Sequence, residues 1–286
     1  MSRVPPRAGG GDGAAEDVRL RPIARRLREH VIRMITAAGS GHPGGSLSAA
    51  EIVTVLFFHT LRRRPGEPTW PDRDRFVISK GHAVPIVYAA LAEAGEIPTP
   101  ELASLRKLES RLQGHPDRIA LPWIEAATGS LGQGLSIALG MALAGRLDGD
   151  RYRVFCLLGD GEVQAGQVWE AAMAAGKYRV GNLVVILDYN KVQLDGPVSE
   201  IMDLEPLAEK WRSFNWQVRV LANGNDLRQV LDALDGAGRS GCPELLIANT
   251  VKGKGVSFME NAAAWHGKAP SAEEAERALR EIAADG

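Results

Sequence analysis

Apolar residues recur every three or four positions in several segments of the chain, a spacing that predicts amphipathic helices. The first series covers residues 23–38 and is followed by Gly39, a residue that favours the end of a helix. Ser48 and Glu51 then have the spacing of a capping box, which predicts a second helix through Leu61. Further helices are expected over residues 85–94, 133–146, 167–177 and 226–235, and after a second capping box formed by Ser271 and Glu274.

Short runs of consecutive apolar residues lie between these helices and predict buried strands. The runs cover residues 75–79, 153–159, 183–189 and 244–250. The strand at 153–159, the helix at 167–177 and the strand at 183–189 follow one another as in a βαβ unit. The predicted fold class is therefore α/β, with a doubly wound, mainly parallel sheet flanked by helices.

Composition excludes some classes of binding partner but does not identify one. The chain has 286 residues, 45% of them hydrophobic, and a net charge of -1, so no basic surface argues for nucleic acid or an anionic membrane. No apolar run is long enough to span a bilayer, and two cysteines without disulfide or metal spacing indicate a reduced cytoplasm. The glycine-rich start predicts a disordered leader over residues 1–18, followed by one domain over 19–286.

One predicted strand ends on a carboxylate between two glycines, Gly159-Asp160-Gly161. Asp-Gly pairs usually form turns, but Asn190 ends the next strand of the same βαβ unit. Ligands of doubly wound folds bind outside the carboxyl ends of strands, so Asp160 and Asn190 are expected to meet there. Two hard oxygen ligands beside glycine amides suit Mg²⁺ bound together with a diphosphate.

Histidines and glycines are paired in an unusual way along this chain. Such pairs are expected where imidazole rings line a tight pocket near bare backbone. His30 and His59 lie within predicted helices, have no glycine neighbour and are predicted to be surface or packing residues. The candidates for a functional role are His42, His82, His115 and His266.

Two lysines and a glycine-rich segment complete the candidate chemistry. Lys80 precedes His82 by two positions and Lys268 follows His266 by two, so both lysines are candidates for cationic or proton-transfer groups. The segment TGSLGQG contains too much glycine for a helix interior and predicts a loop around a ligand, although it lacks the ending of a P-loop.

Taken in order, these motifs resemble the N-terminal, diphosphate-binding half of transketolase, a thiamine diphosphate enzyme. The resemblance extends from about residue 20 to the C-terminus, and the ordered series is more specific than any single motif. The segments that carry it are SGHPGGSLS, RDRFVISKGHA, QGHPD, TGSLGQGLSIALGMA, LLGDGE, LDYNKVQLDG, TVKGKGVSF and WHGKAP.

The resemblance implies roles for individual residues. Asp160 and Asn190 match the metal ligands, and the backbone carbonyl of Val192 matches the third protein ligand of Mg²⁺, Ca²⁺ or Mn²⁺. Gly161 and Lys252 match contacts to the cofactor diphosphate. The loop that meets the aminopyrimidine of thiamine diphosphate is matched by Gly129, Ser130 and Leu131.

The resemblance also implies a reaction, the transfer of a two-carbon ketol unit from a ketose or ketose phosphate to an aldehyde. Lys80 and Lys268 match basic residues that lie near the thiazolium in some members, and His82 also matches a cofactor contact. The residues that match the family's active-site histidines, which handle substrate hydroxyls and protons, are His42, His82, His115 and His266.

The sequence departs from the family pattern in two ways. Ala165 stands where members commonly have a glutamate, and a full transketolase continues into a pyrimidine-binding domain whose glutamate activates the aminopyrimidine. The expectation is a cytoplasmic subunit that requires a C-terminal partner, two copies of each forming a heterotetramer. Candidate interface segments are residues 137–144 and the helix that begins near Gln167.

Two other classes of function remain open from the sequence. A subunit of a deoxyxylulose-phosphate synthase or of a 2-oxo acid dehydrogenase would also bind thiamine diphosphate through Gly-Asp-Gly and a later Asn. A non-catalytic cofactor-binding subunit is the second alternative. The histidine motifs favour transketolase over the first, and the intact Asp160, Asn190 and pocket histidines argue against the second.

Overall fold

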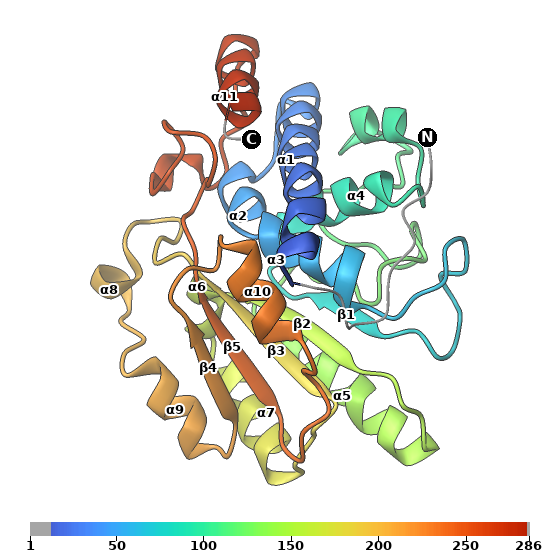
Figure 1. The fold of residues 1–286 in the computed structure, drawn as a ribbon. Coiled ribbons are helices and arrows are strands. Elements are labelled where there is room, and N and C mark those ends of the chain that lie inside the picture. The colour runs from blue at the N-terminus through green and yellow to red at the C-terminus, as the bar shows by residue number, and fades with distance from the viewer. Residues whose placement is uncertain (1–12, 285–286) are drawn as a thin grey trace.

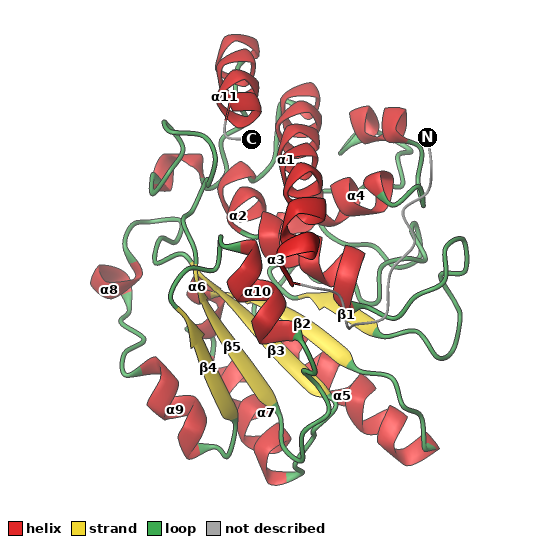
Figure 2. Cartoon of the chain, viewed as in Figure 1, coloured by secondary structure: helices red, strands yellow, loops and turns green. Residues whose placement is uncertain are grey.

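A five-stranded parallel sheet forms the centre of the molecule, and helices cover both of its faces (Figure 1; Figure 2). The computed structural model describes residues 13–284. The strand order is β1-β2-β3-β5-β4, and every neighbouring pair is parallel. The predicted fold class is confirmed. The strands are β1 (Arg75–Ile78), β2 (Val154–Gly159), β3 (Leu183–Tyr189), β4 (Gln217–Leu221) and β5 (Glu244–Asn249).

Strands β2, β3 and β5 are apolar along nearly their whole length because both faces of the sheet are buried. In β2, Phe155 and Leu157 join the core that includes helices α1 (Gly13–Ala38), α4 (Val84–Glu93) and α10 (Leu227–Leu234). Val154, Cys156 and Leu158 join the core built with α5 (Gln133–Asp148) and α7 (Gly166–Lys177). Figure 1 shows α10 in front of the sheet and α5 and α7 behind it.

Strand β4 was not predicted from the sequence. It lies at the edge of the sheet, where only one neighbour pairs with it, and its side chains are largely exposed or half-buried. An edge strand of this kind lacks the apolar run that marks the central strands. After β4 the chain returns through α10 and inserts β5 between β3 and β4, which places α10 on the opposite face from α7.

Helix α1 begins earlier than the apolar pattern indicates. It starts at Gly13 and includes Pro22, so residues 13–18 are helical and the expected leader boundary at residue 18 is wrong for them. Residues 1–12 of the expected leader lie outside the described residues. The buried carboxylate of Glu16 accepts a hydrogen bond of 2.6 Å from Arg19 and lies 3.3 Å from His59 Nδ1, which fixes this first part of the helix.

The first predicted capping box is wrong. Residues around it form two short helices, α2 (Pro43–Ser48) and α3 (Ala50–Val55), with Ala49 at the N-cap of α3 and a π-helical turn, η1 (Leu56–Thr60), after it. Ser48 donates instead to Asp188 at 2.5 Å, and Glu51 pairs with Arg28 at 2.7 Å. Tertiary partners therefore outcompete the local cap for both side chains.

The second capping box is confirmed at the start of α11 (Ala272–Ala284). Glu274 N–H donates to Ser271 Oγ at 3.1 Å, and Ser271 N–H donates to Glu274 Oε2 at 2.8 Å. No helix among residues 13–284 has both the length and the apolar character required to cross a bilayer. The remaining helical elements are α6 (Asp160–Val163), α8 (Val198–Ile201), α9 (Leu207–Ser213), η2 (Gly81–Ala83), η3 (Thr99–Ser104) and η4 (Ala263–Trp265).

The amino ends of the first two strands are tied by a buried ion pair. Asp74 directly precedes β1, Arg153 directly precedes β2, and their side chains lie 2.7 Å apart. The Asp74 carboxylate also accepts hydrogen bonds from the backbone N–H groups of Arg62 and Arg153, both at 2.9 Å. This carboxylate therefore serves to hold the two strands and the preceding loop together.

A helical glycine offers a test of the packing between α7 and the segment that follows α9. A Cβ at Gly176 would lie 1.7 Å from the carbonyl oxygen of Phe214, so Gly176→Ala should lower the free energy of unfolding by about 1–3 kcal/mol. Gly140 in α5 has open space around it, and Gly140→Ala should raise that free energy by about 0.5–1 kcal/mol. Urea unfolding measures both, and equal effects of the two substitutions would contradict this packing.

Candidate functional site

Four neighbouring strands end at the same edge of the sheet, and each is followed by a polar residue that faces one cavity. The residues are Lys80 after β1, Asp160 after β2, Asn190 after β3 and Lys252 after β5. They line a cavity of about 160 Å³, together with His82, Leu131 and His266. The prediction that Asp160 and Asn190 meet at this edge is confirmed, while their role as metal ligands stays a prediction.

The Asp160 carboxylate is buried at the first residue of the one-turn helix α6. Its oxygens accept hydrogen bonds from Gly161 N–H at 2.8 Å and from Lys191 N–H at 2.5 Å. Burial, and then the neighbouring Asp188 carboxylate, raise the pKa of Asp160 to about 6. Two carboxylates this close in a buried site repel each other, and a bound cation would relieve that repulsion.

Three oxygen donors of this cavity fit a hard divalent cation. They are the Asp160 carboxylate, the Asn190 amide and the Val192 carbonyl. The carbonyl already attracts a positive group, because Lys252 Nζ donates to it at 2.7 Å. In the described part of the chain no three His, Cys, Asp or Glu side chains are grouped to hold a metal, so a cation here would depend on these mixed oxygens, which suit Mg²⁺, Ca²⁺ or Mn²⁺.

Lys80 is one of the largest fully buried side chains of the protein. Its Nζ donates to the carbonyl of Gly45 at 2.7 Å and to the carboxylate of Asp188. Burial opposes ionisation of Asp188, but the Lys80 ammonium and the hydrogen bonds of nearby hydroxyl groups keep the pKa of that carboxyl below its usual value. Lys80 therefore lines the cavity with an ammonium that is held by two acceptors.

The four histidines with glycine neighbours lie together, as predicted. The ring centroids of His42 and His82 are 5.2 Å apart, and those of His82 and His266 are 5.0 Å apart. His42 also lies 5.6 Å from His266 and 6.4 Å from His115. Bare backbone surrounds the rings, since a Cβ at Gly267 would contact His42 at 3.5 Å and one at Gly45 would contact His82 at 3.5 Å.

These imidazole rings are neutral near pH 7. Burial, helped by nearby cations, lowers the pKa of His42 and of His266 to about 4. Burial also lowers the pKa of His82 well below its usual value and, with Arg106, lowers that of His115. Neutral rings can accept a proton as well as donate one, which is the requirement for moving protons at hydroxyl groups.

Hydrogen bonds indicate which nitrogen of the His266 ring carries the proton and which nitrogen of the His42 ring has no partner. The Lys252 ammonium lies 2.9 Å from His266 Nδ1 and can only donate, so the proton of that ring is on Nε2. His42 Nδ1 is buried and has no hydrogen-bond partner among the described residues. An unpaired buried nitrogen of this kind fits a site whose partner arrives with a ligand.

The glycine-rich segment over residues 128–134 packs against the end of β2 through Glu162, a residue that sequence analysis did not select. Glu162 is buried and accepts hydrogen bonds from Gly132 N–H at 2.9 Å and Gly159 N–H at 3.1 Å, as well as from Ser79 Oγ. Gly129 lies beside the His115 ring, and Leu131 lines the cavity. Ser130 is exposed.

Ala165 lies beside this segment at the N-cap of α7. Gly132 has φ of +88°, and a Cβ there would lie 2.9 Å from the Ala165 Cβ. Ala165 therefore presents a methyl group to the backbone of the loop. It offers neither a titratable group nor a hydrogen-bond acceptor.

Lys268 lies outside both the cavity and the histidine cluster. Its Nζ pairs with Glu274 at 2.7 Å and lies 4.1 Å from the centroid of the Trp265 ring. Its catalytic role stays a prediction. The histidines expected to be structural also lie apart from the cluster, His30 near Glu93 on α4 and His59 near Glu16 on α1.

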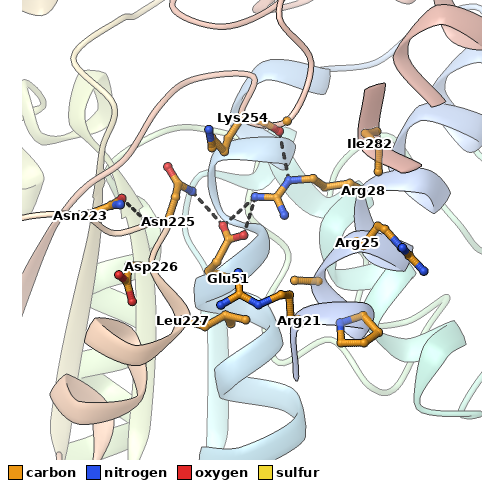
Figure 3. Close-up of a pocket in the computed structure, with 13 residues that line it drawn as sticks. Arg21, Arg25, Arg28, Glu51, Asn223, Asn225, Asp226, Leu227, Lys254 and Ile282 are labelled. Atoms are coloured by element: carbon orange, nitrogen blue, oxygen red, sulfur yellow. Dashed lines mark hydrogen bonds and ion pairs between the residues drawn. The ribbon is translucent and has the colours of Figure 1, made fainter. Parts of the chain in front are cut away.

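A second cavity, of about 370 Å³, adjoins the loop that carries Lys252 (Figure 3). Arg28 Nε donates to the Lys254 carbonyl at 3.0 Å, and Arg28 also pairs with Glu51. Asn225 donates to Glu51 at 2.9 Å and accepts from Val251 N–H at 2.8 Å. Figure 3 shows the bonds among Arg28, Glu51, Asn225 and Lys254. Together with the bond to Val251, they hold the loop over residues 251–255 in place.

Comparison with known proteins identifies the domain. The family description "Transketolase, thiamine diphosphate binding domain" matches residues 21–285. The chain belongs to the transketolase family. Transketolase-like protein 2 of Bos taurus is 46% identical over 267 residues, which are 92% of this chain and 42% of that protein. The chain thus spans about two fifths of the length of that relative.

Shorter relatives and solved transketolase structures are similar along nearly the whole chain. A protein of Clostridium sp. (strain MSTE9) named 6-deoxy-6-sulfo-D-fructose transketolase subunit is 41% identical, over 95% of this chain and 98% of that protein. A subunit of the apulose-4-phosphate transketolase of Actinobacillus succinogenes is 41% identical, over 89% of this chain and 92% of that protein. The crystal structure of Campylobacter jejuni transketolase has a TM-score of 0.87 and 33% identity, over 92% of this chain and 42% of that one.

The low basicity of the histidine cluster predicts a pH dependence of stability. Because burial lowers the pKa of His42 from 6.5 to about 4, the unfolded chain binds a proton before the folded chain does as the pH falls. The free energy of unfolding should be insensitive to this group above pH 6.5 and should decrease between pH 6.5 and about pH 4.

His42→Gln removes the titrating ring and should make that decrease shallower. Thermal midpoints measured across the pH range test this, and the values at pH 7.5, where the ring is neutral, correct for any change in packing. Identical pH profiles of the variant and the wild type would contradict the assignment.

Proposed function

We propose that the chain is the N-terminal subunit of a thiamine diphosphate-dependent transketolase that transfers a two-carbon ketol unit from a ketose or ketose phosphate to an aldehyde. One observation carries the proposal. His82 and His266 of the neutral histidine cluster line the same cavity as the oxygen donors of Asp160, Asn190 and Val192, at the carboxyl ends of β1, β2, β3 and β5. Proton-handling groups and a diphosphate site are thus adjacent.

The cofactor would bind through the ends of three strands. Asp160, Asn190 and the Val192 carbonyl would hold Mg²⁺, Ca²⁺ or Mn²⁺, and the Gly161 amide and Lys252 would contact the diphosphate. When bound, thiamine diphosphate supplies the thiazolium that serves as an electron sink for breaking a carbon–carbon bond. Gly129, Ser130, Leu131 and His82 are the proposed further contacts of the cofactor.

The histidines would move protons at the hydroxyl groups of the substrate. A neutral imidazole would accept the proton of the ketose C3 hydroxyl when the C2–C3 bond breaks. The imidazolium formed would later return a proton to the oxygen of the acceptor aldehyde. His266 presents its Nε2–H because Lys252 engages Nδ1, which suits it to donate a hydrogen bond to a substrate oxygen. His42 has a free Nδ1, which suits it to accept.

A partner subunit with a pyrimidine-binding domain would complete the site, in a cytoplasmic complex of two chains of each kind. The support is that two relatives named as transketolase subunits are covered over 98% and 92% of their lengths. The proposed interface includes the outer sides of α5 and α7. In α5, Ala138 and Ala142 pack on the sheet whereas Gly140 and Ala144 are exposed, and in α7 Met173 is 49% exposed.

The metal requirement gives a direct test. Thiamine diphosphate should bind only when Mg²⁺ or a similar ion is present, and Asp160→Ala should abolish that binding because the diphosphate then faces a site that has lost its metal charge. Asp74→Asn is the control, since it removes another buried carboxylate at the opposite end of the sheet. Calorimetry that gives equal affinity with and without EDTA would contradict the proposed site.

The partner requirement gives a second test. The purified chain should show no ketol transfer with saturating thiamine diphosphate and Mg²⁺, and the product of a neighbouring gene should restore activity with ketose or ketose phosphate donors. In the restored complex His266→Ala should reduce the rate by about 10²- to 10⁴-fold, the usual contribution of a positioned acid or base. His59→Ala, outside the cluster, is the control, and full activity of the isolated chain would refute the requirement.

A further inference from the structure

A carboxylate that the proposed chemistry does not use lies directly beneath the cavity. Asp188 is completely buried near the end of β3, two residues before Asn190. It continues the series of Val184 and Ile186, which face the core built with α1 and α3. A carboxylate is rarely placed so deeply unless each of its oxygens has partners.

Groups from four separate segments converge on Asp188. Ser48 of α2 donates to its Oδ2 at 2.5 Å, and the Lys80 ammonium donates to the same oxygen. Thr250, which follows β5, donates to Oδ1. The fourth donor is Asn190, whose Nδ2 lies 3.2 Å from Oδ2.

The last of these bonds is one of two that orient the Asn190 side chain. A primary amide has a donor end and an acceptor end, whereas an ionised carboxylate only accepts. Asp188 can therefore pair only with the Nδ2 end of Asn190. The amide oxygen then points the other way, where it accepts a hydrogen bond of 3.2 Å from Val192 N–H and borders the cavity. With the amide reversed, the Asn190 oxygen would face the carboxylate and the NH₂ group would face the cation site.

We infer that Asp188 is a positioning residue, which holds the Asn190 amide oxygen toward the metal site, and that Lys80, Ser48 and Thr250 fix the Asp188 carboxylate in place for this role. The inference rests on the proposed function, because it concerns the cation of the same site. It also assigns Lys80 a function that does not require contact with a substrate.

A matched pair of double variants tests the inference. The first variant combines Lys80→Met with Asp188→Asn, and the second combines Lys80→Met with Asp188→Leu. Both remove the buried ion pair and leave positions 80 and 188 uncharged. They differ in whether position 188 can accept a hydrogen bond from Asn190. Replacing a buried ion pair with neutral side chains of similar volume is often tolerated by the fold.

The measurement is a Mn²⁺ titration of the full chain together with its partner subunit, carried out at saturating thiamine diphosphate, with free Mn²⁺ followed by electron paramagnetic resonance. The double variant with Asp188→Asn retains an acceptor and should keep the Mn²⁺ midpoint close to that of wild type. The double variant with Asp188→Leu should weaken binding by at least about tenfold, the usual effect of losing a group that orients a metal ligand. In an Asn190→Ala background the two double variants should bind Mn²⁺ equally.

Each outcome has a separate meaning. Equal midpoints of the two double variants with Asn190 intact would overturn the role of Asp188, because only the acceptor differs between them. Wild-type protein that binds no Mn²⁺ would contradict the proposed function itself. If the leucine variant fails to fold in a thermal melt, Lys80→Met with Asp188→Ala removes the acceptor with a smaller side chain, and the same comparison applies.

Discussion

The buried ion pair of Lys80 and Asp188 is the contact on which the arrangement of the site depends. Removing two charges from water is costly, and the cost is offset only when their hydrogen-bonding capacity is filled. Here that requires Ser48, Thr250 and Asn190 to be in place at once. The pair therefore connects α2, the ends of β1 and β3 and the segment after β5, all of which border the cavity.

The histidine cluster is also controlled by buried charges, but here they keep the side chains neutral. Its rings are buried next to Lys80, Lys252 and Arg106, so added protons are strongly disfavoured. A cationic environment thus keeps imidazole groups in the form that can accept protons. The Lys252 ammonium, which touches both the Val192 carbonyl and His266, links the proposed metal site to the proton-handling groups.

Much of the architecture could be predicted from the sequence because both faces of the central strands are buried. Their apolar runs stand out from the polar loops, and the topology then brings Asp160 and Asn190 to one edge. Glycine neighbours correctly marked four histidines that lie together. Strand β4 and the start of α1 were not recognised, since an exposed edge strand and a helix fixed by Glu16 have little apolar periodicity.

The tertiary partners of polar side chains could not be predicted from local spacing either. Ser48 and Glu51 have the spacing of a capping box, but each binds a residue that is distant in sequence. Ser48 binds Asp188, and Glu51 binds Arg28.

The ion pair of Asp74 and Arg153 lies at the amino ends of β1 and β2, while the proposed chemistry lies at the carboxyl ends. The residues that join the strands and the residues of the proposed site therefore lie at different ends of the sheet. Substitutions around the cavity at the carboxyl ends can therefore change the site without weakening the contacts at Asp74. This separation gives protein engineers one end at which to alter specificity and another at which to raise thermal tolerance.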